Sequence, residues 1–295
     1  MARFGHVLTA MISPFAGDGS LDVEGAKKLA QWLVANGNDG LVIAGTTGES
    51  PTLTHDEQIE LIGAVVDAVD VPVIAGTGSN DTRAAIELTE RATEAGATGV
   101  LSVTPYYNRP SQDGLLAHFR AVAQSTDLPV MLYDIPGRTG RKVDTENIIA
   151  LAQEPNIVAL KDAAGNPAET AIVIANTPDD FDVYSGDDGL TLPLLSVGAV
   201  GVVGVATHWA GIETSQMVQA YHSGNVAEAT RLNQHLLASW DIETGDDRPN
   251  PIPSKTMMRL LGQPGGECRL PMGPEPAGLE DLCRKVLSNL GRPGF

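Results

Sequence analysis

The run Ile157-Val158-Ala159-Leu160-Lys161-Asp162 shows the pattern from which this chain is built. Four consecutive apolar residues, without the polar alternation of a half-exposed strand, are typical of a parallel strand that is covered on both faces. Polar and turn-forming residues follow directly, as they do at the end of a strand. The run therefore predicts one strand of a parallel α/β fold.

Similar runs recur every 20 to 40 residues, each followed by turn-forming residues. Between them, segments such as 23–36, 55–69, 81–95 and 114–125 carry apolar residues three or four positions apart, as amphipathic helices do. Such segments are long enough to cross between parallel strands. Eight strand-and-helix units predict a closed (β/α)₈ barrel, the TIM barrel of the α/β class. The eight predicted strands are 6–13, 40–46, 72–78, 99–105, 129–136, 157–163, 182–188 and 201–207.

The strand signal ends after the eighth run. Segments 213–237, 255–261 and 278–290 are predicted to be helical, with a Pro-rich stretch around 248–254 between the first two. The 295 residues also exceed the roughly 250 of a typical barrel. We therefore expect a catalytic barrel in residues 1–225 and a C-terminal helical extension in residues 226–295.

Composition excludes several classes of partner. The formal net charge is −18, with 19 Lys and Arg against 37 Asp and Glu, which argues against nucleic acid. No apolar run approaches the ~18 residues of a membrane span, and no charged-then-apolar leader follows Met1, so we expect no membrane contact and a cytoplasmic location. Cys268 and Cys283 stand outside any CxxC or Cys/His pattern, so we expect free thiols and no metal.

Lys161 is the strongest catalytic candidate. Active sites of such barrels form at the carboxyl ends of the strands, and Lys161 is the only one of six lysines inside a strand-like run. An ammonium near a barrel interior loses hydration, which lowers its pKa and frees the amine to attack a carbonyl. Lys161 is therefore predicted to form a Schiff base with an α-keto acid. A buried structural lysine paired with Asp162 or Asp187 is the alternative.

Other strand ends carry polar side chains that suit such a substrate. The turn Gly45-Thr46-Thr47-Gly48 offers backbone N–H groups and two hydroxyls to a carboxylate, although such turns are often purely structural. Tyr107 and Tyr133, two of five tyrosines, can relay protons if a hydroxyl such as that of Thr46 is near; the alternative is packing. Arg138 can bind a second carboxylate bidentately, or form a surface ion pair instead.

Together these residues resemble the dihydrodipicolinate synthase family, within the superfamily of pyruvate-dependent class I aldolases and lyases. The resemblance covers essentially the whole chain, and it is specific because several motifs occur together. These motifs are Gly45-Thr46-Thr47-Gly48-Glu49-Ser50, Thr104-Pro105-Tyr106-Tyr107-Asn108-Arg109-Pro110, Tyr133-Asp134-Ile135-Pro136-Gly137-Arg138-Thr139-Gly140, Lys161-Asp162, Ser185-Gly186-Asp187-Asp188 and Asn250-Pro251-Ile252-Pro253.

The resemblance implies a cofactor-free reaction on Lys161, which would form an imine with pyruvate. The backbone and hydroxyls of Thr46 and Thr47 would hold the pyruvate carboxylate, and Tyr133 would act as acid and base. The enamine would then attack the aldehyde of aspartate semialdehyde, and ring closure would release the lysine. Thr46 would link Tyr133 to a tyrosine of a neighbouring subunit.

That tyrosine would be Tyr107, which makes a homotetramer, a dimer of tight dimers, the expected assembly. By the same resemblance, Arg138 would hold the carboxylate of the semialdehyde, and Gly186 and Val203 would line the pyruvate pocket. Val203 stands where an isoleucine is common, and Asp134 replaces a frequent asparagine. We expect both changes to adjust the site rather than abolish it.

The resemblance also implies a degenerate regulatory site. Lysine-inhibited family members bind lysine at the dimer interface through a histidine, a glutamate, an asparagine and a tyrosine. Asn80 and Tyr106 keep the last two, whereas Gln58 and Ala84 match the histidine and the glutamate, with His55 nearby. Because the lysine ammonium would lose its opposing carboxylate, we expect lysine inhibition to be weak or absent.

Two alternative functions remain open at this point. A sibling pyruvate aldolase, which cleaves N-acetylneuraminate or 2-keto-3-deoxy sugar acids, would use the same lysine and tyrosine on a polyhydroxylated aldehyde. A catalytically silent barrel would bind a keto acid as a sensor or scaffold. Tyr106, Tyr107 and Arg138 favour a small aldehyde that carries a carboxylate, and so favour the synthase.

Overall fold

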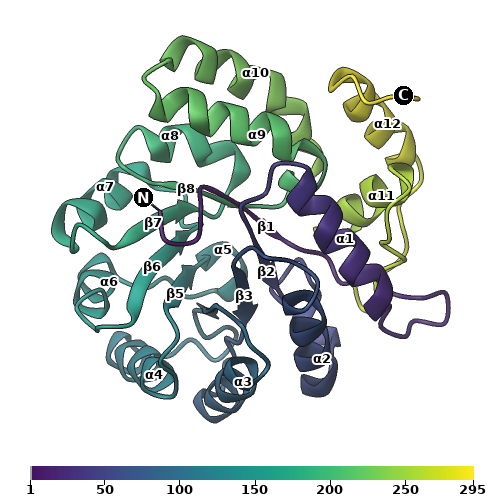
Figure 1. Ribbon diagram of the computed structural model, residues 1–295. Helices are drawn as coiled ribbons and strands as arrows, with labels where there is room; N and C mark the ends of the chain where they lie inside the picture. Colours follow the sequence, from purple (N-terminus) through teal and green to yellow (C-terminus); the bar gives the residue numbers. More distant parts are fainter. Residues whose placement is uncertain (1) are drawn as a thin grey trace.

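A closed barrel of eight parallel strands forms the centre of the molecule (Figure 1), which a computed structural model describes over residues 2–295. Each strand pairs with the next along the chain, and β8 closes the barrel against β1. This arrangement confirms the predicted (β/α)₈ barrel. The strands are β1 (Val7–Ala10), β2 (Gly40–Ile43), β3 (Val73–Gly76), β4 (Gly99–Val103), β5 (Val130–Asp134), β6 (Ile157–Asp162), β7 (Asp182–Ser185) and β8 (Gly201–Gly204).

Helices cover the outside of the barrel, as Figure 1 shows for α1 to α4 and α6 to α9. Asp81 caps α3, and α2 is capped by Thr54 in a capping box with Glu57, with Asp56 in the first turn. The helices are α1 (Val23–Ala35), α2 (His55–Val66), α3 (Thr82–Glu94), α4 (Gln112–Gln124), α5 (Pro136–Thr139), α6 (Thr145–Leu151), α7 (Pro167–Asn176), α8 (Thr191–Leu195) and α9 (Thr207–His222), with short 3₁₀ turns η1 (Ser50–Thr52) and η2 (Asp188–Leu190).

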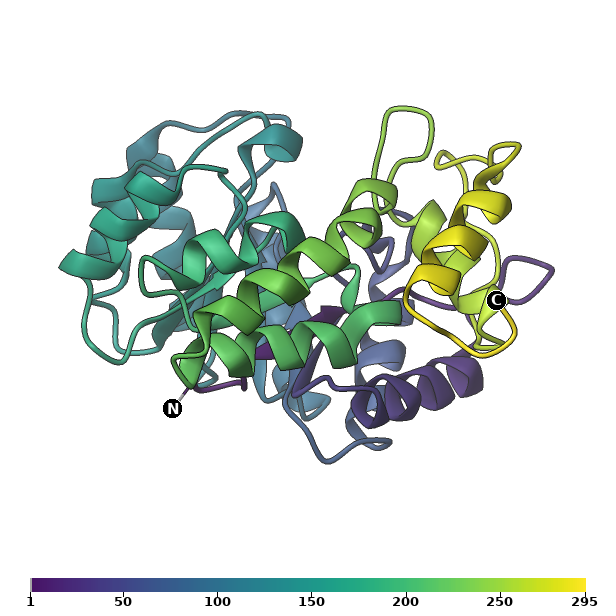
Figure 2. The same ribbon diagram turned by 90° about the horizontal axis from the view of Figure 1, so that it is seen from above.

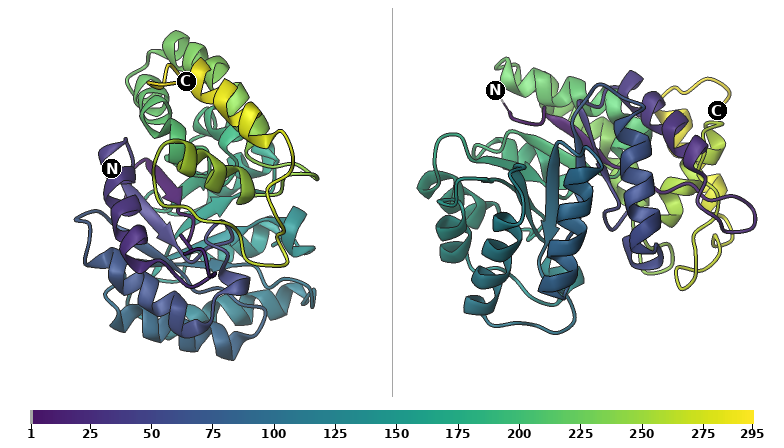
Figure 3. Two further views of the ribbon diagram at one scale, coloured as in Figure 1. Left: turned by 90° about the vertical axis from the view of Figure 1, so that its right-hand side faces the viewer. Right: turned by 60° about the horizontal axis from the view of Figure 1, so that its bottom comes forward.

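Three further helices, α10 (Val226–Ile242), α11 (Ile252–Leu260) and α12 (Leu279–Asn289), follow the barrel. In Figures 2 and 3, α11 and α12 lie at the side of the barrel that carries α1. The prediction of a single helix over 213–237 was wrong, because α9 ends before Gly224, whose φ is +81°. A new helix then starts at Asn225, whose side chain caps α10 by accepting a hydrogen bond from the Glu228 N–H.

All eight predicted strands continue past the observed ones at their carboxyl ends. The second run was predicted to end at Thr46, but β2 ends at Ile43, and Ala44 adopts a positive φ of 56°. A left-handed residue breaks the regular ladder and turns the chain, so the residues after it form a loop. The loops after the strands therefore hold most of the candidate polar residues.

The apolar core has two parts. One cluster fills the barrel interior and includes Leu8, Val42, Met131 and Tyr184, and a larger cluster lies between the barrel and the helices around it. A filled interior leaves only the two ends of the barrel open to a ligand. Across residues 2–295, no helix combines the length and the apolarity that crossing a bilayer requires.

Candidate active site

Lys161 and Tyr133 lie side by side inside the carboxyl end of the barrel. They are register partners on β6 and β5, and the Lys161 Nζ lies 4.4 Å from the centre of the Tyr133 ring. Lys161 is 4% exposed and Tyr133 is 5% exposed. The two side chains thus bring a nucleophile and a proton donor together, and both are largely shielded from solvent.

Burial changes the acid–base behaviour of both groups. It lowers the pKa of Lys161 to about 8, against the opposing effect of the Asp188 and Glu243 carboxyls. It raises the pKa of Tyr133, which keeps the phenol protonated at neutral pH. A neutral amine is therefore accessible near neutral pH, beside a phenol that can donate a proton.

A cavity of about 160 Å³ opens beside this pair. Its volume lies below the ~300–1,000 Å³ of pockets for drug-sized ligands, so it suits a small acid. A second cavity of about 200 Å³ adjoins it and shares Thr46, Tyr133 and Arg138 with it. The predicted residues that line the first cavity are Lys161, Tyr133, Thr46, Thr47, Arg138 and Gly186.

Gly186 has no side chain, which leaves room for the side chain of Lys161. A β-carbon at position 186 would lie 3.0 Å from the Lys161 Cγ and 2.9 Å from the Ala163 Cβ, closer than such atoms approach without displacement. The Gly186 N–H also donates to the Asp162 carbonyl at 2.7 Å. A side chain here would therefore push the lysine out of its position.

The turn that carries Thr46 and Thr47 is held by the C-terminal segment. The Thr47 Oγ1 accepts a hydrogen bond of 3.0 Å from the Asn250 Nδ2. The Glu49 carboxylate forms a buried ion pair of 2.6 Å with Lys255 on α11. Glu49 has a left-handed backbone with φ of 56°, a conformation that needs such support. Thr47 and Glu49 are thus both held by residues of the C-terminal segment.

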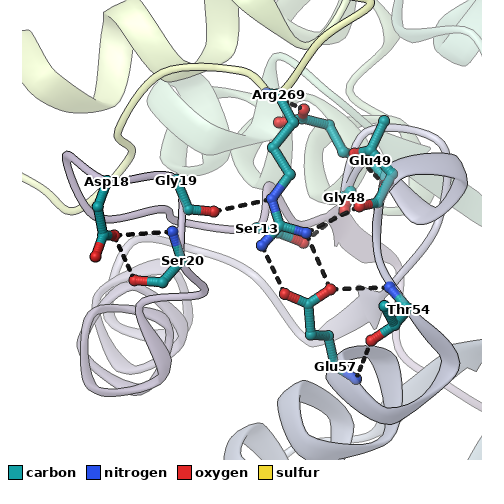
Figure 4. Close-up of polar contacts among 10 residues, drawn as sticks. Ser13, Asp18, Gly19, Ser20, Gly48, Glu49, Thr54, Glu57 and Arg269 are labelled. Atoms are coloured by element: carbon teal, nitrogen blue, oxygen red, sulfur yellow. Dashed lines mark hydrogen bonds and ion pairs between the residues drawn. The ribbon is translucent and has the colours of Figure 1, made fainter.

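Arg269 adds a third connection (Figure 4). Its backbone N–H donates to the Glu49 carboxylate at 2.9 Å, and its guanidinium binds both oxygens of Glu57 at 2.9 and 2.6 Å. The same guanidinium donates to the carbonyls of Gly19 and Thr52. Arg269 therefore joins the C-terminal segment to the turn, to the first turn of α2 and to the loop before α1.

Tyr107 and Val203, also predicted site residues, do not line either cavity. Tyr107 is 90% exposed and has a left-handed backbone with φ of 74°. Its side chain therefore projects from the single chain into solvent. Val203 is fully buried in the cluster that fills the barrel, and Val205, two residues further on, lines the cavity instead.

The residues of the expected regulatory site lie on several elements of the chain. Tyr106 lines the second cavity and is 37% exposed. Gln58 is buried and its amide donates to the Ser50 carbonyl at 3.0 Å, so it supports the same turn. The carbonyl of Asn80 accepts from Asn108. Beyond these, Ala84 is partly buried and His55 is exposed.

Several residues at the site were not predicted from the sequence. Glu243, Thr244 and Asn250 line the cavity, although all three come from the extension after the barrel. The only sequence signal was the Asn-Pro-Ile-Pro motif. Asp188, which is buried, was quoted in a motif but was given no role.

Asp188 and Glu243 form an acidic pair close to Lys161. Burial raises the pKa of Asp188 to about 6, and burial together with the Asp188 charge raises that of Glu243. Asp188 is held in place because its carboxylate accepts from the Val205 N–H at 2.7 Å. Within the described part of the chain, no group of three or more His, Cys, Asp or Glu side chains is placed to hold a metal ion.

Fold and site together define the class of protein. A buried lysine of lowered pKa, beside a buried phenol at the carboxyl end of a (β/α)₈ barrel, is the arrangement of an enzyme that forms a Schiff base with a carbonyl substrate.

The comparisons with known proteins identify the family. The model of the dihydrodipicolinate synthetase family matches residues 3–289. A 4-hydroxy-tetrahydrodipicolinate synthase from Acidothermus cellulolyticus is 55% identical over 274 residues, which are 92% of this chain and 87% of that protein. The chain therefore belongs to the dihydrodipicolinate synthetase family.

Solved structures agree with this assignment. One is the dihydrodipicolinate synthase from Cyanidioschyzon merolae with lysine bound. Its sequence is 45% identical, and its structure has a TM-score of 0.95 and covers 99% of both chains. That of the chloride-inhibited dihydrodipicolinate synthase from Acinetobacter baumannii complexed with pyruvate is 34% identical, with a TM-score of 0.92 over 98% of this chain and 99% of the other. The chain therefore shares both the fold and the length of these enzymes.

Proposed function

We propose that this lyase condenses pyruvate, bound as a Schiff base on Lys161, with L-aspartate 4-semialdehyde to give 4-hydroxy-tetrahydrodipicolinate, a step of diaminopimelate and lysine biosynthesis. The observation that carries the proposal is the buried pair Lys161 and Tyr133, with the lysine Nζ 4.4 Å from the centre of the tyrosine ring. Both residues line a small cavity that Thr46 and Thr47 also line. Similarity to a 4-hydroxy-tetrahydrodipicolinate synthase, at 55% identity, supports the choice of substrates.

The proposed reaction begins when the neutral Lys161 amine attacks the keto carbon of pyruvate. The protonated phenol of Tyr133 donates a proton to the departing oxygen, and water leaves as the imine forms. Loss of a methyl proton gives the enamine, whose carbon attacks the aldehyde of the second substrate. The amine of that substrate then attacks the imine carbon, closes the ring and displaces Lys161, so no cofactor is needed.

Two features of the cavity suit the carboxylates of the substrates. Thr46 and Thr47 line the same cavity as Lys161, and their hydroxyls are assigned to the carboxylate of the keto acid bound to it. Arg138, on the short helix α5 after β5, lines both cavities and is assigned to the carboxylate of the semialdehyde. The carboxylates of pyruvate and of the semialdehyde would thus be held by different residues.

We further propose that the enzyme works as a homotetramer, a dimer of tight dimers, in the cytoplasm. The exposed Tyr107 supports the shared site, because a phenol that projects into solvent completes a proton relay only if it enters the cavity of a partner. Thr46, which lines both cavities, is assigned as the link between that phenol and Tyr133. Light scattering and cell fractionation test the assembly and the location.

The direct test of the reaction compares two coupled assays. One supplies pyruvate and aspartate semialdehyde, and the other supplies pyruvate and N-acetylmannosamine. We expect turnover in the first and at least ~100-fold less in the second, since the cavity offers Arg138 to a carboxylate. Faster turnover in the second would assign the chain to the sugar-acid aldolases, and no turnover in either would favour a silent keto-acid-binding barrel.

Weak regulation by lysine remains part of the proposal. Gln58, at the position of a family histidine, is occupied by its hydrogen bond to the Ser50 carbonyl, and Ala84 has no carboxylate to offer an ammonium. An inhibition titration should show no sub-millimolar effect of lysine on the natural chain. The Gln58→His, Ala84→Glu variant should gain inhibition, and sub-millimolar inhibition of the natural chain would contradict the assignment.

A further inference from the structure

Asn250 is a buried polar residue that has no role in the proposed reaction. It lies between Pro249 and Pro251, just before α11, and is 6% exposed. It nevertheless lines the same cavity as Lys161. A buried amide at a ligand cavity needs partners for its donors and its acceptor, so its hydrogen bonds show what it is placed to do.

The hydrogen bonds of Asn250 have a defined direction. Its Oδ1 accepts from the Ser254 hydroxyl at 3.5 Å, which leaves the Nδ2 to donate to the Thr47 Oγ1 at 3.0 Å. Thr47 is 3% exposed, and its hydroxyl carries a single hydrogen. Because the Thr47 oxygen already accepts from Asn250, that hydrogen is free to be donated elsewhere. Among residues 2–295, the Thr47 hydroxyl donates to no acceptor of the protein itself.

We propose that Asn250 is a positioning residue, which turns the Thr47 hydroxyl into a donor aimed at the carboxylate of the keto acid. The inference rests on the proposed function, in which Thr47 binds that carboxylate. It deepens that function by bringing the C-terminal extension into substrate recognition. A hydroxyl that accepts from a neutral amide donates more readily to an anion, since successive hydrogen bonds strengthen one another.

A purely structural role for Asn250 is the competing explanation. The turn around Thr47 has its own supports, because Glu49 is bound by Lys255 and by the backbone N–H of Arg269. Removal of the Asn250 amide should therefore leave the turn in place and change only the direction of the Thr47 hydroxyl. The two explanations differ in whether the affinity for pyruvate or the integrity of the fold is lost.

The decisive variant is Asn250→Asp, which keeps the size and reverses the polarity. The new carboxylate would accept the only hydrogen of Thr47 and would place a negative charge beside the substrate carboxylate. We expect the KM for pyruvate to rise about 30-fold or more, with a smaller change in kcat. Asn250→Ala should raise it about 5- to 20-fold. Asn176→Asp, the same change at an exposed residue at the end of α7, should leave KM unchanged.

A double-mutant cycle tests whether Asn250 acts through Thr47. In a Thr47→Val background the hydroxyl is absent, so Asn250→Ala should add less than about 2-fold to the KM for pyruvate. Borohydride trapping of acetone, a ketone without a carboxylate, should be equal in the natural chain and in Asn250→Ala. Multiplicative effects in the cycle, or equal losses with acetone and pyruvate, would show a structural role and overturn the inference.

The outcome also separates this inference from the proposed function. If borohydride traps no pyruvate on the natural chain, the proposed function fails first. If the natural chain traps pyruvate and Asn250→Asp traps it with the same concentration dependence, the proposed function stands and the role of Asn250 is refuted. Thermal melting of each variant checks that the fold is retained.

Discussion

Lys161 is surrounded by groups with opposing effects on its charge. Burial removes water from the ammonium and lowers its pKa, whereas the carboxyls of Asp188 and Glu243 favour the charged form. The balance gives a pKa of about 8, against an ordinary value of 10.5. With a pKa of about 8, Lys161 populates both protonation states near neutral pH. The ammonium form pairs with the carboxyls, and the neutral form can react with a carbonyl.

The pH dependence of imine formation should report this balance. Only the neutral amine attacks, so the rate of pyruvate trapping should rise with pH and level off above a midpoint near 8. An exposed lysine would keep gaining rate up to its ordinary pKa of 10.5. Asp188→Asn should move the midpoint to lower pH, because it removes a negative charge that favours the ammonium. A midpoint that is unchanged or higher in this variant would contradict the assignment.

Space is the second requirement of Lys161, and Gly186 provides it. We expect Gly186→Ala to reduce pyruvate trapping at least ~10-fold, because the new methyl group would overlap the Lys161 Cγ and the Ala163 Cβ. Gly137→Ala is the matched control, since a β-carbon there meets nothing within 4 Å. Equal trapping by the two alanine variants would show that the lysine has room to adapt.

Sequence patterns located Lys161 and Tyr133 because both stand at the carboxyl ends of apolar strands, where barrel enzymes keep their reactive groups. They could not locate Glu243 or Asn250, since neither belongs to a barrel strand or to a turn after one. These residues reach the cavity only through the packing of α10 and of the Pro-rich segment against the barrel. Tertiary packing of this kind leaves no periodic signal in the sequence.

At the scale of elements, the active-site turn depends on the segment after α11. Arg269 binds Glu57, Gly19 and Thr52 through its side chain, and stacks 4.3 Å from the Phe15 ring. Its side chain is only 20% exposed. The Arg269 guanidinium thus connects the C-terminal segment to the loop before α1 and to the start of α2.

Arg269→Ala should therefore destabilise the protein far more than the loss of a surface ion pair. We expect a loss of about 2 to 4 kcal/mol in the free energy of unfolding, because Glu57 and two carbonyls lose a partner together. Arg284→Ala, which removes an exposed pair with Glu280, should cost less than about 0.5 kcal/mol. Urea denaturation measures both, and similar midpoints for the two variants would argue against this role.

The elements themselves were predictable to different degrees. The eight strands followed from continuous apolar runs, but their carboxyl ends were placed too late, because apolar or small residues continue into left-handed turns such as Ala44. The break between α9 and α10 was missed because the apolar periodicity continues across it. Only the backbone at Gly224 and the cap at Asn225 show that two helices meet there.

At the scale of the whole molecule, the exposed Tyr107 predicts complementation between inactive variants. Tyr107→Phe and Lys161→Ala should each have little activity alone. After they are mixed under conditions that exchange subunits, a hybrid pair can unite an intact Lys161 with the intact Tyr107 of its partner. We expect a quarter or so of natural activity to return, a rough estimate from random pairing into dimers. No recovery in a sample shown to contain hybrids would mean that Tyr107 does not act across subunits.

If Lys161 carries the substrate as an imine, reductive trapping should show the adduct on this residue. The enzyme is treated with borohydride in the presence and absence of pyruvate, and then digested for peptide mass spectrometry. We expect one reduced pyruvyl group per chain on Lys161, formed only with pyruvate, together with loss of activity. Modification of another lysine, or full activity after treatment with no adduct on Lys161, would contradict it.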